Sequence, residues 1–337
     1  MSLLPFLLAI CSSFFLTWLF RRYALSRSLM DIPNTRSSHS IPTPRGGGVA
    51  IVITFLLALP ILSFMGLLNW SVTWALLGAG SCVALLGFLD DHGHIAARWR
   101  LLGHFFAAVW ALIWLNGLPP LTVLGVRIEL LWVGDIVAAV YLVWVLNLYN
   151  FMDGIDGLAS IEAICVCVGG AVIYLFLNLS DAALLPLLLA GSVAGFLIWN
   201  FPPAKIFMGD AGSGFLGIIL AILSVQAAWI STQLFWSWII LLGVFNVDAT
   251  FTLTRRLIRG DKVYEAHRSH AYQYASRFYK AHKPVSITIG IINLLWLFPW
   301  ALTVATSKID GLVALFIAYT PLIFLAVKFK AGAKENE

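Results

Sequence analysis

The stretch Leu146–Gly157 reads LNLYNFMDGIDG and follows a long run of apolar residues. Its polar members are two amides and two carboxylates at intervals of three: Asn147, Asn150, Asp153 and Asp156. Residues three apart on a helix stay near one face, so the pattern predicts a polar stripe at the end of an apolar helix. Gly154 and Gly157 would let a ligand approach the backbone. A polar cap at a membrane surface is the simpler interpretation, but four polar residues in register favour a functional site.

The composition is that of a polytopic membrane protein. Of 337 residues, 61% are hydrophobic and 11% charged, and the mean hydropathy is +0.91. Soluble domains contain about 45–50% apolar and about 25% charged residues. The four cysteines lie in apolar runs, which favours core positions over a disulfide framework or a metal site: Cys11, Cys82, Cys165 and Cys167. We find no soluble region and predict one integral-membrane domain over residues 1–337.

Runs long enough to cross a bilayer, at about 20 residues each, predict an all-α fold with about eleven transmembrane helices. They lie near Leu3–Phe20, Gly48–Leu68, Val72–Leu89, Leu102–Leu118, Leu130–Leu148, Leu158–Leu179, Ala183–Phe201, Phe215–Ile230, Leu234–Leu253, Val285–Thr306 and Leu312–Val327. The first run has no small-residue cleavage site after it, so we expect it to be retained as a span.

The basic residues predict the orientation of these spans. On this span map, nineteen of the 21 Lys and Arg residues fall on one side, and only Arg127 and Lys308 fall on the other. Loops rich in Lys and Arg face the cytoplasm. The C-terminus is therefore expected in the cytoplasm and the N-terminus on the other side of the membrane.

Six aspartates converge on the predicted cytoplasmic face: Asp90, Asp91, Asp153, Asp156, Asp210 and Asp248. Carboxylates beside a basic loop suggest a divalent cation that handles phosphates, because Mg²⁺ prefers hard oxygen ligands. Asp210 lies in the glycine-rich segment FMGDAGSG, which predicts a tight turn with backbone N–H groups facing an anion. We therefore predict an active site at this face.

The most basic loop contains EAHRSHAYQ, with His267 and His270 three residues apart. A zinc site and an interfacial helix that binds lipid headgroups are both open interpretations. We favour phosphate or diphosphate binding. The glycines Gly46–Gly48, after Pro44 and Arg45, either form a loop that enters the second span or let backbone approach the substrate.

These blocks together resemble the polyprenyl-phosphate N-acetylaminosugar-1-phosphate transferases, the glycosyltransferase family 4 of MraY and WecA type. The resemblance covers most of the chain and implies a multi-pass protein of the bacterial inner membrane, with its N-terminus in the periplasm. Its blocks are Ser38-His39 with Pro42–Gly47, Phe88–Asp91, Asn147–Leu158, Asn200–Asp210, and Asp248 with Arg255, Arg256 and His267–His270. The PRGGG and HRSH segments look closest to the WbpL type, which starts O-antigen synthesis.

The resemblance implies transfer of a sugar-1-phosphate from a UDP-N-acetylaminosugar to undecaprenyl phosphate, with release of UMP. It also implies Mg²⁺, with Mn²⁺ as a substitute. Asp210 would hold the metal, with Asp90 and Asp91 near the metal and the lipid phosphate. The predicted catalytic residues are Asp90, Asp91, Asp153 and Asp156. The predicted substrate-binding residues are Arg45, Asn147, Asn150, Gly154, Ile155, Asn200, Phe207, His267, Arg268 and His270.

Two departures from the family pattern are visible. The peptidoglycan members have three consecutive histidines where this chain has HRSH, and the proline often found before the Asp248 position is missing. A phosphate monoester has its second pKa at about 6, so the lipid phosphate is mostly dianionic at neutral pH. We therefore favour its direct attack on the sugar-bearing phosphorus. Asp90 or Asp91 would then position the acceptor or deprotonate its monoanionic fraction.

The main alternative is a secondary transporter for an anionic lipid or a nucleotide sugar. Transporters place ionisable residues near the bilayer midplane in repeated halves, whereas these carboxylates gather at one interface. A structural scaffold of the cell envelope would not need this carboxylate set. The sequence leaves the sugar open between GlcNAc and 6-deoxy sugars such as FucNAc and QuiNAc. It predicts membrane lipids as partners and no nucleic acid, and the resemblance makes a homodimer plausible.

Overall fold

The computed structural model describes residues 4–33, 41–93, 95–262 and 267–334. Ser38, His39 and the start of the first predicted span lie outside these ranges. In the first half of the chain the elements are α1 (Leu4–Ser26), β1 (Met30–Asp31), β2 (Thr43–Pro44), α2 (Val49–Phe64), α3 (Trp70–His92), α4 (Ala97–Leu115), β3 (Leu121–Val123), β4 (Val126–Ile128), α5 (Leu131–Met152) and α6 (Leu158–Phe176).

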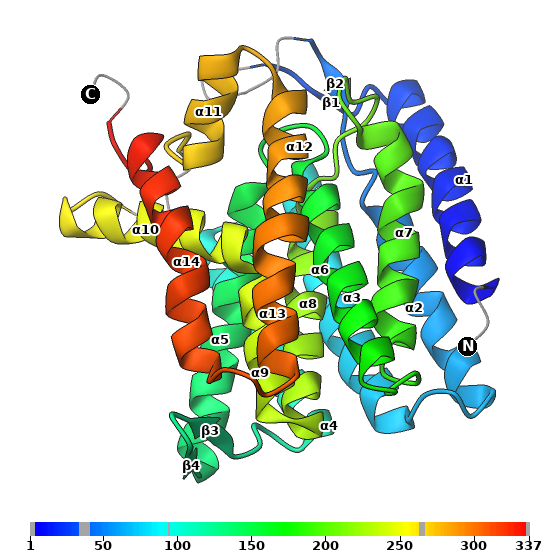
Figure 1. Cartoon of the computed structure of the whole chain (residues 1–337). Coiled ribbons are helices and arrows are strands. Elements are labelled where there is room, and N and C mark those ends of the chain that lie inside the picture. The colour runs from blue at the N-terminus through cyan, green and yellow to red at the C-terminus, as the bar shows by residue number, and fades with distance from the viewer. Residues whose placement is uncertain (1–3, 34–40, 94, 263–266, 335–337) are drawn as a thin grey trace.

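The second half continues as α7 (Leu184–Asn200), α8 (Asp210–Ile230), α9 (Thr232–Leu241), α10 (Gly243–Ile258), α11 (Ala271–Tyr279) and α12 (His282–Ile292). A π-helical segment, η1 (Asn293–Leu297), joins α12 to α13 (Phe298–Ala305), and α14 (Gly311–Lys328) follows. Most of these helices run roughly parallel in one bundle, and the short helix α11 lies at its upper end (Figure 1).

The fold is that of a polytopic membrane protein, as predicted. In the described ranges, seven helices are long and apolar enough to cross a membrane, or eight if the bent pair α9–α10 counts as one span. Helices α2 and α7 are apolar but shorter. Each predicted run coincides with helix, but the count of eleven spans stays a prediction.

One predicted run is not a continuous helix. The segment Leu234–Leu253 is broken at Leu242, where α9 and α10 meet at an angle of 69°. Helix α10 lies across the bundle in Figure 1. It contains Asp248 and ends with Arg255 and Arg256 in its last turn.

Helix α8 forms the centre of the bundle. Its residues from Ala211 to Val225 are all buried, and it packs against α3, α5 and α9. An apolar helix without a polar face is the type that is buried on all sides. Its first residue is Asp210, so the central helix points its N-terminus at the predicted site.

Two short antiparallel hairpins depart from the purely α-helical prediction. β1 pairs with β2, and β3 pairs with β4. At the β3–β4 turn, Leu124 and Gly125 both have positive φ, the geometry that closes a two-residue hairpin. The two hairpins lie at opposite ends of the bundle (Figure 1).

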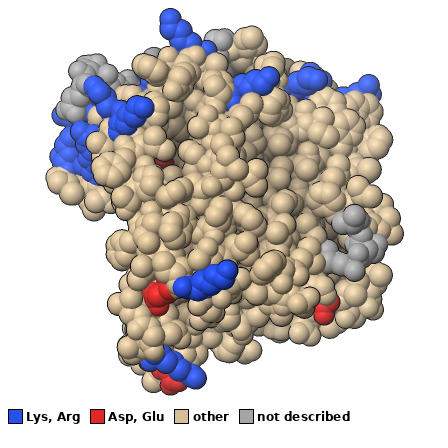
Figure 2. All heavy atoms as spheres, in the orientation of Figure 1, with Lys and Arg blue, Asp and Glu red and all other residues tan. Residues whose placement is uncertain are grey.

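Basic side chains gather at one end of the molecule. On the face in Figure 2, Lys and Arg lie mainly along the upper edge and upper left, while the broad middle carries mostly uncharged residues. The upper end also contains α11, the β1–β2 hairpin and the end of α14 (Figure 1). This segregation agrees with the predicted charge asymmetry; which end faces the cytoplasm stays a prediction.

Candidate active site

Arg45 joins two of the predicted carboxylates. Its Nη2 atom lies 2.8 Å from Asp91 Oδ1 and 2.9 Å from Asp210 Oδ1. Backbone hydrogen bonds fix the Arg45 loop, because Gly47 and Gly48 donate to the carbonyls of Phe207 and Met208 at 2.9 Å each. Backbone hydrogen bonds therefore attach the first basic loop to the segment that precedes α8.

Asp91 holds the start of α8. Its carboxylate accepts the backbone N–H groups of Asp210 at 3.1 Å and Ala211 at 3.3 Å. Gly209 precedes them with φ of +79°, and a Cβ there would lie 2.7 Å from Asp91 Oδ2. A carboxylate at a helix N-terminus satisfies free N–H groups and suits the helix dipole. Asp91 is thus a buried capping residue of the predicted catalytic pair.

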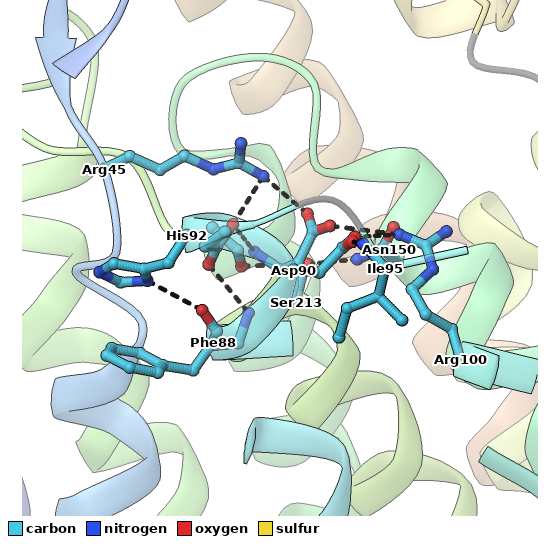
Figure 3. A network of polar contacts seen from close by, with 12 residues as sticks. Arg45, Phe88, Asp90, His92, Ile95, Arg100, Asn150 and Ser213 are labelled. Carbon is cyan, nitrogen blue, oxygen red and sulfur yellow. Dashed lines mark hydrogen bonds and ion pairs between the residues drawn. The ribbon is translucent and has the colours of Figure 1, made fainter. Parts of the chain in front are cut away.

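Asp90 faces a second arginine. Its Oδ2 atom pairs with Arg100 of α4, and its Oδ1 atom accepts the Ile95 N–H at 2.8 Å. The same Arg100 nitrogen lies 3.7 Å from Asp210 Oδ2. In Figure 3, Arg45 and Arg100 approach the cluster from opposite sides. Asp210 therefore lies between two guanidinium groups.

The predicted helical stripe is only half helical. Asn147 and Asn150 lie on α5, but the helix ends at Met152 and Asp153 is its C-cap. Asp156 lies in the following loop, so the expectation of four residues on one helix face is wrong for the two carboxylates. At Gly154 a Cβ would lie 2.1 Å from the Tyr272 hydroxyl, so the close approach of α11 selects glycine.

Asp156 connects three segments. Its Oδ2 atom accepts the Ala204 N–H at 3.0 Å, and its Oδ1 atom lies 3.2 Å from Nδ1 of His282. Ser286 donates to the Asp156 carbonyl at 2.8 Å. The N-terminal part of α12 therefore fixes the position of the loop that contains Asp156.

Asn200 also ties loops together. Its Oδ1 atom accepts the Gly157 N–H and its Nδ2 atom donates to the Ile206 carbonyl, both at 3.0 Å. Asn200 is 4% exposed. Both ends of its amide are therefore bound to backbone, which fixes the loop around Asp156 against the segment before α8.

Most of the predicted residues line one cavity of about 210 Å³, which we call the carboxylate cavity. Those that line it are Arg45, Asn150, Asp153, Gly154, Ile155, Asp156, Asn200, Phe207 and Asp210. A second, wider hollow of about 710 Å³, the basic hollow, shares Asp156, Phe207 and His282 with it. Its cationic lining residues are Arg268, Arg277, Lys280 and Lys283. The two spaces together form a polar site with a negative and a positive part.

Two predicted residues lie deeper. Asp90 and Asn147 line a small space of about 20 Å³, the inner cavity, together with Asn150 and Asp210. Asn147 donates to the Val143 carbonyl of its own helix at 2.7 Å. The predicted stripe is thus divided between the carboxylate cavity and the inner cavity.

The two predicted histidines lie away from the carboxylate cavity lining. His270 is 1% exposed, and its Nδ1 atom lies 3.3 Å from Asp248 Oδ1. Asp248 also accepts the N–H groups of Ala271 at 2.9 Å and Tyr272 at 3.0 Å. Asp248 therefore caps α11, which gives this buried carboxylate a structural role.

His267 is neutral at physiological pH in this arrangement. Burial lowers the pKa of its imidazole to about 3, and the neighbouring His270 and Arg256 act in the same direction. Its Nδ1 atom lies 3.0 Å from the Ser269 hydroxyl. Of the predicted HRSH residues, Arg268 is the one that lines a described cavity, the basic hollow.

The site holds more negative than positive charge. Burial raises the pKa of the Asp153 carboxyl to about 7; Asp210, Asp91 and Asp156 also raise it, while Arg45 opposes them. Burial and the neighbouring carboxylates thus both disfavour ionisation of Asp153.

The residues fit Mg²⁺ better than a fully protein-bound metal. Among the described residues, no group of three or more His, Cys, Asp or Glu side chains converges to hold an ion. Mg²⁺ commonly takes one or two carboxylates and completes its shell with water and substrate phosphate. Asp210, with Asp90 beside it, offers that kind of partial shell.

Several residues at the site were not predicted. Arg100 pairs with Asp90, and Asp31, Ser213, Gln273 and His282 line the carboxylate cavity. Asn150 donates to the Ser213 hydroxyl at 3.0 Å. Arg100 was visible in the sequence as a basic residue ten positions after Asp90. Nothing in the sequence pattern separates His282 or Gln273 from other residues of the basic loop.

Comparison with known proteins agrees with this geometry. The glycosyl transferase family 4 profile matches residues 73–228. A probable undecaprenyl-phosphate N-acetylglucosaminyl 1-phosphate transferase of Bacillus subtilis is 30% identical, over 98% of this chain and 92% of its own length. An undecaprenyl-phosphate alpha-N-acetylglucosaminyl 1-phosphate transferase of Thermotoga maritima is 27% identical, over 85% and 87%.

A phospho-N-acetylmuramoyl-pentapeptide-transferase of Moorella thermoacetica is 33% identical over a shorter part, 55% of this chain and 61% of its own length. The family profile covers α3 to most of α8, the part that supplies Asp90, Asp153 and Asp210. These similarities confirm the predicted family and its enzyme class, the sugar-1-phosphate phosphotransferases. With a relative that matches almost its whole length, the chain belongs to glycosyl transferase family 4.

Proposed function

We propose that this chain transfers an N-acetylaminosugar-1-phosphate from a UDP-sugar to undecaprenyl phosphate and releases UMP. The donor sugar is GlcNAc or a 6-deoxy sugar such as FucNAc or QuiNAc, and the product starts O-antigen and lipopolysaccharide assembly, as in WbpL-type enzymes. One observation carries the proposal: Asp210 lies between Arg45 and Arg100, next to a cavity rich in carboxylates.

This arrangement suits phosphoryl transfer. Two guanidinium groups near one carboxylate provide fixed N–H donors for phosphate oxygens, and arginine binds phosphate with defined geometry. Asp210 and Asp90 would hold Mg²⁺, which neutralises phosphate charge when bound. Mn²⁺ would substitute for it. The chain's own residues then orient the donor and the acceptor.

The acceptor phosphate attacks the sugar-bearing phosphorus of the donor directly. A bond forms from the lipid phosphate oxygen to that phosphorus, and the bond to the oxygen bridging the two donor phosphates breaks, so UMP leaves. The acceptor is already mostly dianionic at neutral pH, so a base contributes little. Asp90 pairs with Arg100 and accepts the Ile95 N–H, which supports a role in positioning the acceptor.

The basic hollow supports donor binding beyond the carboxylate cavity. The carboxylate cavity alone, at about 210 Å³, is small for a whole nucleotide sugar. The shared walls at Asp156 and His282 allow one ligand to occupy both spaces. Arg268 lines the basic hollow, where it would contact the diphosphate or the sugar of the donor. His267 and His270 support the loop that contains Arg268.

The site is proposed to face the cytoplasm of a bacterial inner membrane, crossed by eleven spans, with the N-terminus in the periplasm. Segregation of basic residues to the end that contains the site supports this orientation. We also propose that the protein forms a homodimer.

UMP release tests the function. The purified protein in detergent receives undecaprenyl phosphate, Mg²⁺ and a panel of UDP-N-acetylaminosugars. We expect release that needs lipid, metal and Asp210, with Asp181→Asn, on an exposed loop, as the matched control. Release that persists in Asp210→Asn would contradict the assigned site. No release with any donor by folded protein would favour the transporter, tested next by flux into vesicles.

A further inference from the structure

The inner cavity lies on the buried side of Asp210. It has a volume of about 20 Å³, and its polar lining comes from Asp90, Arg100, His104, Asn147, Asn150 and Asp210. These residues belong to α3, α4, α5 and α8, so four helices meet there. A polar cavity of this size holds one water molecule, given two to four hydrogen-bonding partners.

His104 is the unexplained member of this group. It lies on α4 one turn after Arg100 and is 9% exposed. Its Nδ1 atom is buried and has no hydrogen-bond partner among the described residues. The next buried positions on α4 are alanines, Ala107, Ala108 and Ala111. Burying the polar ring of His104 among these small apolar side chains costs free energy unless the ring has a hydrogen-bond partner.

The charged groups that act on His104 are Arg100 and Asp90. The Arg100 guanidinium carries five N–H donors. Its Nη1 atom pairs with Asp90 and lies 3.7 Å from Asp210 Oδ2. A water in the inner cavity can accept from this guanidinium and donate to the free ring nitrogen of His104. Such a bridge would fix the plane of the guanidinium.

We propose that His104 is a positioning residue, which acts through an ordered water in the inner cavity to hold Arg100 against Asp90 and Asp210. This inference rests on the proposed phosphotransfer, because the aim of Arg100 matters only where phosphates bind beside Asp210. A small misorientation of such a group costs much of the rate, since positioning supplies a large part of phosphoryl-transfer catalysis.

Three variants test the proposal. His104→Leu replaces the polar ring with an apolar side chain of similar bulk, and His104→Gln keeps a polar group at the cavity. We expect His104→Leu to lower kcat about 10- to 100-fold with the KM for the donor changed by less than about twofold. His104→Gln is expected to restore most of the rate. Arg100→Met provides the background for a double-mutant cycle.

In the Arg100→Met background, His104→Leu should cost no more than about twofold further, because its effect passes through Arg100. The free energy of unfolding of the four proteins in this cycle is also measured, so that the coupling between His104 and Arg100 is obtained without turnover. A wild-type protein that shows this coupling but turns over no donor would contradict the proposed function and leave the water bridge supported.

The unfolding temperature of each variant shows whether a lower rate comes from lost positioning or from lost folding. Equal loss in both Arg100 backgrounds, or a wild-type rate in His104→Leu, would overturn the proposal. Where His104→Leu fails to fold, the comparison of His104→Gln with His104→Asn replaces it, since these amides differ in reach. An experimental structure should show a water within about 3.2 Å of His104 Nδ1; an empty or apolar-filled cavity would refute the bridge.

Discussion

The carboxylate of Asp91 accepts the backbone N–H of Asp210 at 3.1 Å, so the last turn of α3 holds the first residue of the central helix. Two neighbouring aspartates of one motif therefore have different tasks. Asp90 faces Arg100, and Asp91 organises the backbone beneath Asp210.

Asp91→Asn should mainly lower stability, whereas Asp210→Asn should mainly lower activity. Asp91→Asn loses an acceptor for the Ala211 N–H, so we expect its free energy of unfolding to fall by about 1–3 kcal/mol. Asp210→Asn should keep its unfolding temperature but lose UMP release by about 100-fold or more. Thermal unfolding and turnover measured on both variants decide this. An Asp91→Asn variant of native stability without turnover would show that Asp91 acts in the chemistry.

Arg45→Lys should not conserve function. Arg45 contacts Asp91 and Asp210 through one guanidinium, and a lysine ammonium lacks the planar fork that leaves further N–H groups for a phosphate. We expect kcat/KM for the donor to fall about 10- to 100-fold, as for loss of a charged hydrogen bond. Arg127→Lys, in the exposed pair with Glu129 on the β3–β4 hairpin, is the matched control. Equal activity of both variants would remove Arg45 from the site.

His282→Ala should weaken donor binding. The imidazole supports Asp156, which lines both the carboxylate cavity and the basic hollow. Loss of a hydrogen bond to a charged group should raise the donor KM about tenfold and leave the acceptor KM unchanged. His92→Ala, whose ring bonds only the Phe88 carbonyl at 2.9 Å among the contacts in Figure 3, is the control. A change confined to kcat would contradict a donor-side role.

Asp153 should make stability depend on pH. Its pKa rises from 3.8 to about 7 in the folded chain, so the folded state binds more protons between these values than the unfolded state does. Stability contributed by the neutral form is thus complete below about pH 4 and is lost as the pH rises toward about 7. Asp153→Asn should therefore gain unfolding temperature over wild type across that range, with a constant gain above it.

This comparison is made without divalent cations, since a bound cation would favour the ionised carboxyl. Asp181→Asn serves as the exposed control and should give curves parallel to wild type. Parallel curves for Asp153→Asn as well would show that the carboxyl is ionised at neutral pH.

The sequence predicted the membrane fold and most of the cavity lining, because long apolar runs and Asp–Gly motifs are local signals. It did not predict the bend at Leu242, because Leu234–Leu253 reads as one apolar run. It also misassigned Asp153 and Asp156 to a helix, because the spacing of three continues past Met152, where the helix ends. Arg100 and His282 were missed because only tertiary packing brings them to the aspartates.

The sharing of Asp156, Phe207 and His282 between the carboxylate cavity and the basic hollow has an evolutionary consequence. The charged residues of the carboxylate cavity come mainly from the ends of α5 and α8 and the Arg45 loop, whereas the cationic residues of the basic hollow come from α11, its flanking loops and the start of α12. Under the proposed function, substitutions in the second region would change which donor is accepted, while the first region would retain the phosphate chemistry.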